Sequence, residues 1–379
     1  MSNTSNKQIF LSPPWTGREE IAAVKRAFES GYVAPCGPQV EEFERRLANL
    51  SGRQFAIAVS SGTAAMDLLM EEFGVDKYTT IIAPTLTFIA TVGPAWHRGA
   101  RIAFVDCDKT GNIDLRLLEV AIREEKARLG KSRRDKNRLP PYNRQRIVVI
   151  ASDLYGRCFD YWRIQRCCHE NGANLIADCA ESVGATREGR PSGSFGDAAI
   201  FSFNGNKIVT TSGGGAILTN NAEVNARLRK RCQQSREPVP WYEHKEVGYN
   251  YRMSNLLAAV GIAQLKKLPK ILKKRARIAA WYAKHAKGLE PLPPVEGENH
   301  WLTVMLAESE AARDGLLQRL AKARIEARPV WKPLHLQPVF KKCRVYGGEV
   351  AEDLFRRGIC LPSGTGLTAA DLARIGKNL

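Results

Sequence analysis

The sequence predicts an α/β protein in which a large domain with a mostly parallel central sheet precedes a smaller α+β domain. Short apolar segments, such as residues 55–59 and 147–151, have the length of buried strands, and segments with a helical spacing of apolar residues lie between them. Strands that alternate with helices are typical of a parallel sheet covered by helices. From Ser254 the pattern changes to a long helical region, so we expect domains over 1–253 and 254–379.

The individual elements follow from the periodicity of apolar residues. In the first domain we expect helices at 17–30, 39–50, 63–73, shortly after Thr87 and at 161–172, and strands at 55–59, 81–83, 101–105, 147–151, 174–177, 198–203 and 216–219. In the second domain we expect a helical region from 254 to about 289, interrupted at Pro269 because proline lacks the N–H that a helix interior uses. A strand at 301–306 and a helix at 311–323 complete it.

Composition restricts the class of protein. The chain has 379 residues, of which 44% are hydrophobic, and it contains no apolar run long enough to cross a membrane. Its first residues lack the apolar segment of a secretory signal, so a cytoplasmic location is expected. The nine cysteines include no C-x-x-C pair, which argues against a zinc site or a disulfide framework, and no metal is expected.

The chain is strongly basic, with a net charge of +18 that results from 57 Lys and Arg against 39 Asp and Glu. A positive balance favours anionic partners, which include nucleic acid, anionic lipid and phosphorylated small molecules. Part of the excess lies in residues 126–146, a polar stretch that we interpret as a solvated surface loop. Because neither base-stacking aromatic residues nor a docking motif accompany this charge, nucleic-acid binding is not expected.

Lys207 stands apart from the other basic residues. Between Pro191 and Ala226 it is the only Lys or Arg, whereas the composition of the chain would place several there. It follows an apolar strand at 198–203 and a polar turn, and it precedes the glycines 213–215. A lysine in a dry, glycine-lined cleft has its ammonium form disfavoured, so a nucleophilic amine suited to Schiff-base chemistry becomes available. From these residues alone, a catalytic and a structural surface lysine are equally supported.

Other polar groups are expected at the carboxyl ends of strands, where ligands of open α/β sheets bind. Asp178 ends the strand at 174–177 and can pair with a protonated pyridine nitrogen, or it can cap the next helix. Glu181 lies one helical turn further, close enough to approach the same ring. The segment 60–65 is a strand–turn–helix junction whose small residues let backbone N–H groups approach a phosphate. Ser202 can add a hydroxyl to that phosphate or be a strand serine without a ligand.

Together these segments resemble the DegT/DnrJ family of sugar aminotransferases over nearly the whole chain. The resemblance rests on the order and spacing of short motifs, each of which is unspecific alone. The motifs are Leu11–Pro14, Ser61–Ala65, Ala83–Ala90, Asp178–Glu181, Ser202–Lys207, Thr210–Gly215, Gly248–Arg252 and Gly358–Gly364. The resemblance implies a pyridoxal-phosphate (PLP) enzyme of aminotransferase fold type I, with pyridoxamine phosphate (PMP) as the intermediate form of the cofactor.

The resemblance also implies roles for individual residues. Lys207 would carry PLP as a Schiff base and move the proton to and from the substrate carbon, while Asp178 would pair with the pyridine nitrogen. The further cofactor contacts are Gly62, Thr63 and Ser202 at the phosphate, Phe88 stacked on the ring, and Glu181 beside it. Asn250 matches a residue that reaches the phosphate from a second subunit, which implies a homodimer with shared active sites. Arg252 and His335 are candidate substrate contacts, with surface, salt-bridge or structural roles as alternatives.

Two positions near the expected site depart from the family pattern. Glu181 stands where many members carry Gln, although some bacillosamine-pathway enzymes carry Glu. Asp153 replaces a His that is common in relatives, and the sequence assigns it no role. Residues 242–255 and 328–335 resemble the enzymes that make UDP-4-amino-4,6-dideoxy-N-acetylglucosamine, the bacillosamine precursor.

The expected function is transfer of the amino group of L-glutamate to C4 of a nucleotide-linked 4-keto-6-deoxy sugar, in the biosynthesis of a surface glycan. The expected acceptor is UDP-2-acetamido-2,6-dideoxy-hexos-4-ulose, and the alternative is GDP-4-keto-6-deoxymannose, as in GDP-perosamine synthases. A PLP-dependent sugar dehydratase is disfavoured because those relatives carry His in place of Lys207. An alternative of another class, motivated by charge alone, is a basic regulatory or nucleic-acid-binding protein.

Overall fold

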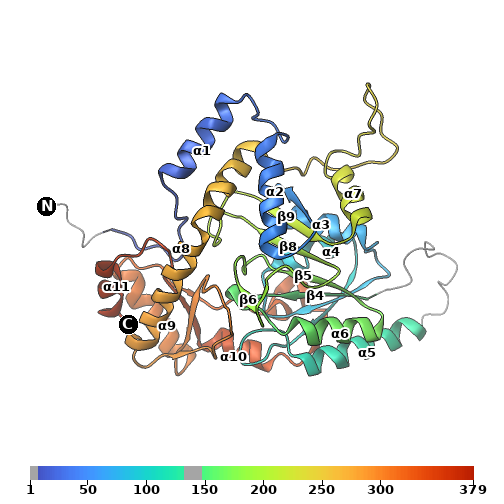
Figure 1. The fold of residues 1–379 in the computed structure, drawn as a ribbon. Coiled ribbons are helices and arrows are strands. Elements are labelled where there is room, and N and C mark those ends of the chain that lie inside the picture. Colours follow the sequence, from blue (N-terminus) through green and yellow to red (C-terminus); the bar gives the residue numbers. More distant parts are fainter. Residues whose placement is uncertain (1–6, 132–146) are drawn as a thin grey trace.

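The α/β class and the mostly parallel central sheet that the sequence predicts are confirmed in the computed structural model, which describes residues 7–131 and 147–379 (Figure 1). Of the basic stretch 126–146 that was predicted to be a surface loop, residues 126–131 instead form the end of a helix, and residues 132–146 lie outside the described residues. Within the described part of the chain, no helix is both long and apolar enough to span a bilayer.

The central sheet has eight strands in the order β1–β9–β8–β5–β4–β2–β3–β13. The strands are β1 (Phe55–Val59), β2 (Thr80–Pro84), β3 (Arg101–Val105), β4 (Ile147–Ser152), β5 (Asn174–Asp178), β8 (Ala198–Ser202), β9 (Gly215–Thr219) and β13 (Arg344–Tyr346). Strand β9 is antiparallel to both of its neighbours, and the other pairs are parallel. Parallel strands bring their carboxyl ends to one edge, so this arrangement places the polar residues that follow β2, β4, β5 and β8 close together.

Helices cover both faces of the sheet, which explains why its strands are continuously apolar. Alternate strand residues such as Ala58 and Ile57 belong to different cores, one on each face. One core is closed by α2 (Pro38–Ser51), α5 (Leu115–Lys131), α6 (Tyr161–Asn171) and α8 (Asn255–His285), and the other by α3 (Gly62–Glu72), α4 (Gly93–His97) and α7 (Ala222–Arg231). Helix α1 (Arg18–Glu29) packs on α8 and projects from the body (Figure 1).

The C-terminal part contains a second, antiparallel sheet in the order β10–β11–β14–β12. Its elements are β10 (Glu290–Pro291), β11 (Thr303–Leu306), α9 (Glu310–Lys322), β12 (Arg328–Pro329), α10 (Glu349–Arg357), β14 (Gly358–Leu361) and α11 (Ala369–Gly376), and the large part also holds the short pair β6 (Thr186–Arg187) and β7 (Arg190–Pro191). The domain division at residue 253 stays a prediction. Helix α8 begins two residues later, while β13 returns to the large sheet and Ile9 pairs with Ile325.

Helix α8 differs from the expectation, because it continues unbroken through Pro269 for 31 residues. A proline inside a helix costs about 3 kcal/mol or more through the lost hydrogen bond and the ring clash. Packing on both sides of Pro269 offsets that cost. The N-terminal half lies against α1 and α2, and the C-terminal half buries Ile278 and Tyr282 in the core of the C-terminal part. Helix α8 therefore connects the two parts as one continuous element.

Candidate active site

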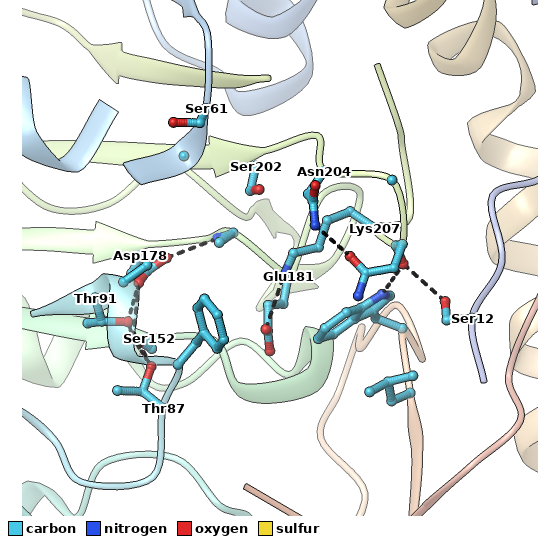
Figure 2. Close-up of a pocket in the computed structure, with 18 of the residues that line it drawn as sticks. Ser12, Ser61, Thr87, Thr91, Ser152, Asp178, Glu181, Ser202, Asn204 and Lys207 are labelled. Atoms are coloured by element: carbon cyan, nitrogen blue, oxygen red, sulfur yellow. Dashed lines mark hydrogen bonds and ion pairs between the residues drawn. The ribbon is translucent and has the colours of Figure 1, made fainter. Parts of the chain in front are cut away.

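A cleft of about 900 Å³ opens at the carboxyl ends of the central strands. Its walls come from the N-terminal segment, the ends of β4, β5 and β8, the start of α3, and loops of the C-terminal part. Seven of the residues predicted from the sequence line it, namely Gly62, Thr63, Phe88, Asp178, Glu181, Ser202 and Lys207. Figure 2 shows Glu181 next to Lys207 in this cleft and Asp178 further along it, near Thr91 and Ser152.

Lys207 lies in the loop after β8, with its side chain 13% exposed. Its Nζ is 3.0 Å from Glu181 Oε1 and 4.0 Å from the ring centroid of Trp301 (Figure 2). The sequence predicted a dry, glycine-lined environment, but a carboxylate and the face of an indole ring are the main partners. Both attract a cation, so they hold the amine at a defined place in the cleft.

Glu181 is buried, and its two oxygens have different partners. Oε1 faces Lys207, and Oε2 accepts a 2.7 Å hydrogen bond from the backbone N–H of Tyr155. Burial raises the pKa of Glu181, while the charge of Lys207 and the Tyr155 amide oppose that rise. Tyr155 itself adopts φ 54°, an uncommon conformation for a bulky residue, and this turn aims its N–H at the carboxylate.

Asp178 ends β5 and is buried without a cationic partner, since no ion pair among residues 7–131 and 147–379 includes it. Its Oδ2 accepts hydrogen bonds from Thr91 Oγ1 at 2.7 Å and Ser152 Oγ at 3.4 Å, and its Oδ1 accepts one from the Ala180 N–H at 3.2 Å (Figure 2). Burial raises the pKa of Asp178, and these hydrogen bonds together with the charge of Lys207 oppose the rise. A buried carboxylate held in this way fits a protonated pyridine nitrogen, whose charge would compensate its own.

The start of α3 and the end of β8 form a cradle for an anion. Ser61 caps α3 by accepting a hydrogen bond from the Ala64 N–H at 3.0 Å, so the N–H groups of the first turn lie at the cleft. A Cβ at Gly62 would lie only 3.0 Å from the Ser202 Cβ, which shows how closely the two elements approach. The N–H groups, the Thr63 hydroxyl and the Ser202 hydroxyl fit the phosphate of PLP.

An aromatic wall completes the cleft. Phe88 is 55% exposed, and its ring lies 5.5 Å from the Trp331 ring, centroid to centroid. Trp331 in turn packs on Tyr155 at 5.0 Å. An exposed ring beside Asp178 suits stacking on a flat heteroaromatic ring. The protein residues present therefore fit PLP at its phosphate, its ring face and its ring nitrogen.

Three residues predicted from the resemblance do not line the cleft of this chain. Asn250 is exposed and pairs with Gln233 in a bridge, and Arg252 pairs with Val59. His335 lies with Nδ1 2.6 Å from Thr85 Oγ1 and Nε2 3.1 Å from a Glu352 oxygen. Their roles toward the cofactor of a second subunit and toward substrate stay predictions.

The sequence did not single out Trp301, Trp331, Thr91 or Ser152 as site residues, yet all four line the cleft. Ser152 is the last residue of β4 and Thr91 lies in the turn after β2, so their place at the carboxyl edge of the sheet was a usable signal. The two tryptophans lie outside regular elements of the C-terminal part; Trp301 was expected to begin a strand at 301–306, but that strand, β11, begins at Thr303.

Asp153, the position without an assigned role, is buried at the end of β4 and also lines the cleft. Its Oδ2 accepts hydrogen bonds from Ser182 Oγ at 2.5 Å and Cys158 Sγ at 3.6 Å, whereas its Oδ1 has no hydrogen-bond partner in the structure. Burial raises the pKa of Asp153 to about 7, against the effect of the Ser182 hydrogen bond. The Asp153 carboxyl, which Ser182 connects to the Asp178–Glu181 turn, therefore keeps its proton at a higher pH than an ordinary aspartate does.

Comparison with known proteins identifies the class. The model of the DegT/DnrJ/EryC1/StrS aminotransferase family matches residues 14–379. EpsN of Bacillus subtilis (strain 168), whose name describes a pyridoxal phosphate-dependent aminotransferase, is 40% identical over 380 residues, which cover 98% of this chain and 94% of EpsN. The GDP-perosamine synthase of Caulobacter vibrioides is 33% identical over 377 residues, which cover 97% and 96%. The PLP form of Spr1654 from Streptococcus pneumoniae, named as a sugar aminotransferase, superposes with a TM-score of 0.85 at 25% identity and covers 98% of this chain and 97% of that chain.

The chain belongs to the DegT/DnrJ/EryC1/StrS aminotransferase family. It is a PLP-dependent aminotransferase of the kind that acts on sugars, and the fold and cofactor predicted from the sequence are confirmed.

The buried Asp153 carboxyl predicts a pH dependence of stability. Between the unfolded pKa of about 4 and the folded value of about 7, the folded protein keeps a proton that the unfolded chain has lost. The free energy of unfolding should therefore fall as pH rises through this window. In Asp153→Asn that loss is absent, so from pH 5 to pH 8 the variant should gain roughly 2 kcal/mol relative to the parent protein.

The measurement is urea unfolding of both proteins at pH 5, 6, 7 and 8, with PLP at the same saturating concentration throughout because a bound ligand shifts apparent stability. Parallel stability curves for the two proteins would show that Asp153 is ionised in the folded state and that its environment has been misjudged.

Proposed function

We propose that this protein transfers the amino group of L-glutamate to C4 of a nucleotide-linked 4-keto-6-deoxy sugar, with UDP-2-acetamido-2,6-dideoxy-hexos-4-ulose as the acceptor. The observation that carries the proposal is the convergence in one cleft of the Lys207 amine, the helix cradle at Gly62 and the buried carboxylate of Asp178, which forms no ion pair with the described residues. Membership of the family supports the reaction type.

The residues of the chain have separate tasks in this reaction. Bound PLP supplies a carbonyl carbon that takes up the amino group and a ring that withdraws electrons. Lys207 Nζ attaches the cofactor when no substrate is bound, and once released it moves a proton at the substrate carbon. Asp178 keeps the ring nitrogen protonated, and Phe88 limits movement of the ring. Glu181, 3.0 Å from Nζ, forms an ion pair with Lys207 when the amine is not bonded to the cofactor.

The choice of acceptor rests on the likeness of residues 242–255 and 328–335 to the bacillosamine-pathway enzymes. GDP-4-keto-6-deoxymannose is the second candidate, because the Caulobacter vibrioides GDP-perosamine synthase is 33% identical over 97% of this chain. Arg328 lines the cleft and pairs with Glu326 at 2.8 Å, and its remaining donors can reach the diphosphate of either nucleotide.

An acceptor assay separates the two candidates. The PLP-loaded enzyme is incubated with L-glutamate and either the UDP-linked or the GDP-linked ketosugar, and the products are identified by mass spectrometry and NMR. We expect 2-oxoglutarate and a UDP-linked 4-amino sugar to form together, with little turnover of the GDP substrate. Preference for the GDP-linked ketosugar would replace the proposed acceptor while leaving the reaction type intact.

The role of Lys207 is tested by chemical trapping. Borohydride reduction of the holoenzyme should leave a pyridoxyl label on the peptide that contains Lys207, as mapped by mass spectrometry, because only an amine bonded to the cofactor becomes fixed to it. Lys207→Ala should lose at least about a thousandfold in kcat, since one group both binds the cofactor and transfers protons. Lys322→Ala, at the exposed end of α9, is the control. A label on another lysine would contradict the assignment.

We also propose that the active unit is a homodimer in which Asn250 completes the site of the other subunit. Asn250 lies outside the cleft of its own chain. Large apolar side chains are exposed on α1 and on the segment between α7 and α8, both of which project from the body (Figure 1): Ile21, Phe28, Trp241, Tyr242 and Val247. Exposed apolar surface of this kind is typical of contact between copies.

Mixed dimers test this arrangement. Lys207→Ala and Asn250→Ala are each expected to be severely impaired alone. In a mixed dimer, one site combines both substitutions and the other has neither. After subunit exchange, about one quarter of the parental activity should return if each site draws Asn250 from the partner subunit. No recovery, despite mixed dimers detected by native mass spectrometry, would show that each site is built from one chain.

A further inference from the structure

A buried arginine without an acidic partner lies behind the catalytic cleft. Arg275, on α8, is 2% exposed, and no ion pair in the described part of the chain includes it. It donates hydrogen bonds to three oxygens, which are the Trp301 carbonyl at 2.5 Å, Thr365 Oγ1 at 3.1 Å and Ser12 Oγ at 3.1 Å. Burial lowers its pKa to about 9. A buried charge without a counter-ion is costly, so we expect a role for the three hydrogen bonds that Arg275 makes.

Two of these contacts lead to the residue before Lys207. Ser12 Oγ, which accepts from Arg275, donates to the Asn206 carbonyl at 3.0 Å (Figure 2). Trp301, whose carbonyl accepts from Arg275, donates its Nε1–H to the same Asn206 oxygen at 2.7 Å. The two lone pairs of that carbonyl are therefore both used, and the backbone at Lys207 is held from two sides.

Trp301 is also the ring that faces the Lys207 amine, at 4.0 Å from Nζ. Its backbone is fixed at both ends, because its N–H donates to Asn299 Oδ1 at 2.9 Å and its carbonyl accepts from Arg275. Asn299 Nδ2 in turn donates to the Glu181 carbonyl at 2.8 Å. Both partners of the lysine amine, Glu181 and Trp301, thus belong to one hydrogen-bonded set.

We propose that Arg275 is a positioning residue for Lys207. Arg275 connects the N-terminal segment at Ser12 and the C-terminal part at Trp301 and Thr365 to the loop that carries the lysine. This assignment rests on the proposed function, in which Lys207 transfers protons. A misplacement of about 1 Å in such a group can lower a rate about a hundredfold, so the position of the loop matters more for turnover than for substrate binding.

The test compares Arg275→Met, Arg275→Lys and the control Arg313→Met. Arg313 is also buried on a helix, α9, but it pairs with Asp314 and Glu310 and donates to the Phe355 carbonyl at 2.6 Å, and none of these partners lines the cleft. For each holoenzyme we would measure kcat and KM for both substrates, the pH midpoint of the visible absorption of the bound cofactor, and urea unfolding.

We expect Arg275→Met to lower kcat about tenfold to a hundredfold with KM nearly unchanged. The pH midpoint of the cofactor absorption should rise, because removal of a buried positive charge favours the protonated form nearby. Arg275→Lys keeps the charge but not the three hydrogen bonds, so its midpoint should be close to that of the parent while kcat stays low. Arg313→Met should lose stability only.

Arg275→Met with parental kcat and midpoint, and a stability loss like that of Arg313→Met, would reduce Arg275 to a structural residue. If Arg275→Met does not fold, Ser12→Ala removes one link without opening a large cavity. It should lower kcat and leave the midpoint unchanged, and a parental kcat for Ser12→Ala would overturn the proposal. A parent protein that binds no PLP or does not transaminate would instead contradict the proposed function.

Discussion

The ion pair between Lys207 and Glu181 is the interaction around which the cleft is arranged. Both groups are largely withdrawn from water, and removing one partner of such a pair typically costs about 3–5 kcal/mol because the other charge is left uncompensated. Neighbouring residues hold both groups of this pair in place. Tyr155 adopts a positive φ that directs its N–H to the second oxygen of Glu181, and Trp301 places its ring face against the amine.

The two carboxylates of the Asp178–Glu181 turn differ in their partners, and this difference separates their tasks. Glu181 has a cation within the chain, whereas Asp178 has only hydroxyl and amide donors from Thr91, Ser152 and Ala180. Burial raises the pKa of both groups. Asp178 has no ion pair in the described part of the chain, and only the more distant charge of Lys207 favours its carboxylate form. A ligand cation therefore gains most at Asp178, and this is where the ring nitrogen of PLP fits.

The cleft depends on segments that are far apart along the chain. Its floor is the carboxyl edge of the central sheet, and its far wall comes from the N-terminal segment and from loops around Trp301 and Trp331. Helix α8 passes from one part to the other without a break, so the position of the C-terminal part relative to the sheet is set by a rigid element. Arg275 lies on this helix at the point where these segments meet the Lys207 loop.

Local rules of sequence determined seven strands of the large sheet, the helices α1, α2, α3 and α6, the isolation of Lys207, the place of Asp178 at the end of β5 and the small residues at the start of α3, but they did not predict α5, α7 or β13. Each of the predicted features depends on residues that are close in the sequence, because apolar periodicity, glycines and strand ends can be recognised within a short segment. Only the tertiary structure decided that α8 continues through Pro269, that Glu181 and Trp301 are the partners of Lys207, and that Asp153 and Arg275 are buried. These outcomes depend on contacts between segments that are distant in the sequence. Packing outweighs the cost of a proline inside α8, and the burial of a charged side chain leaves no periodic pattern in the sequence.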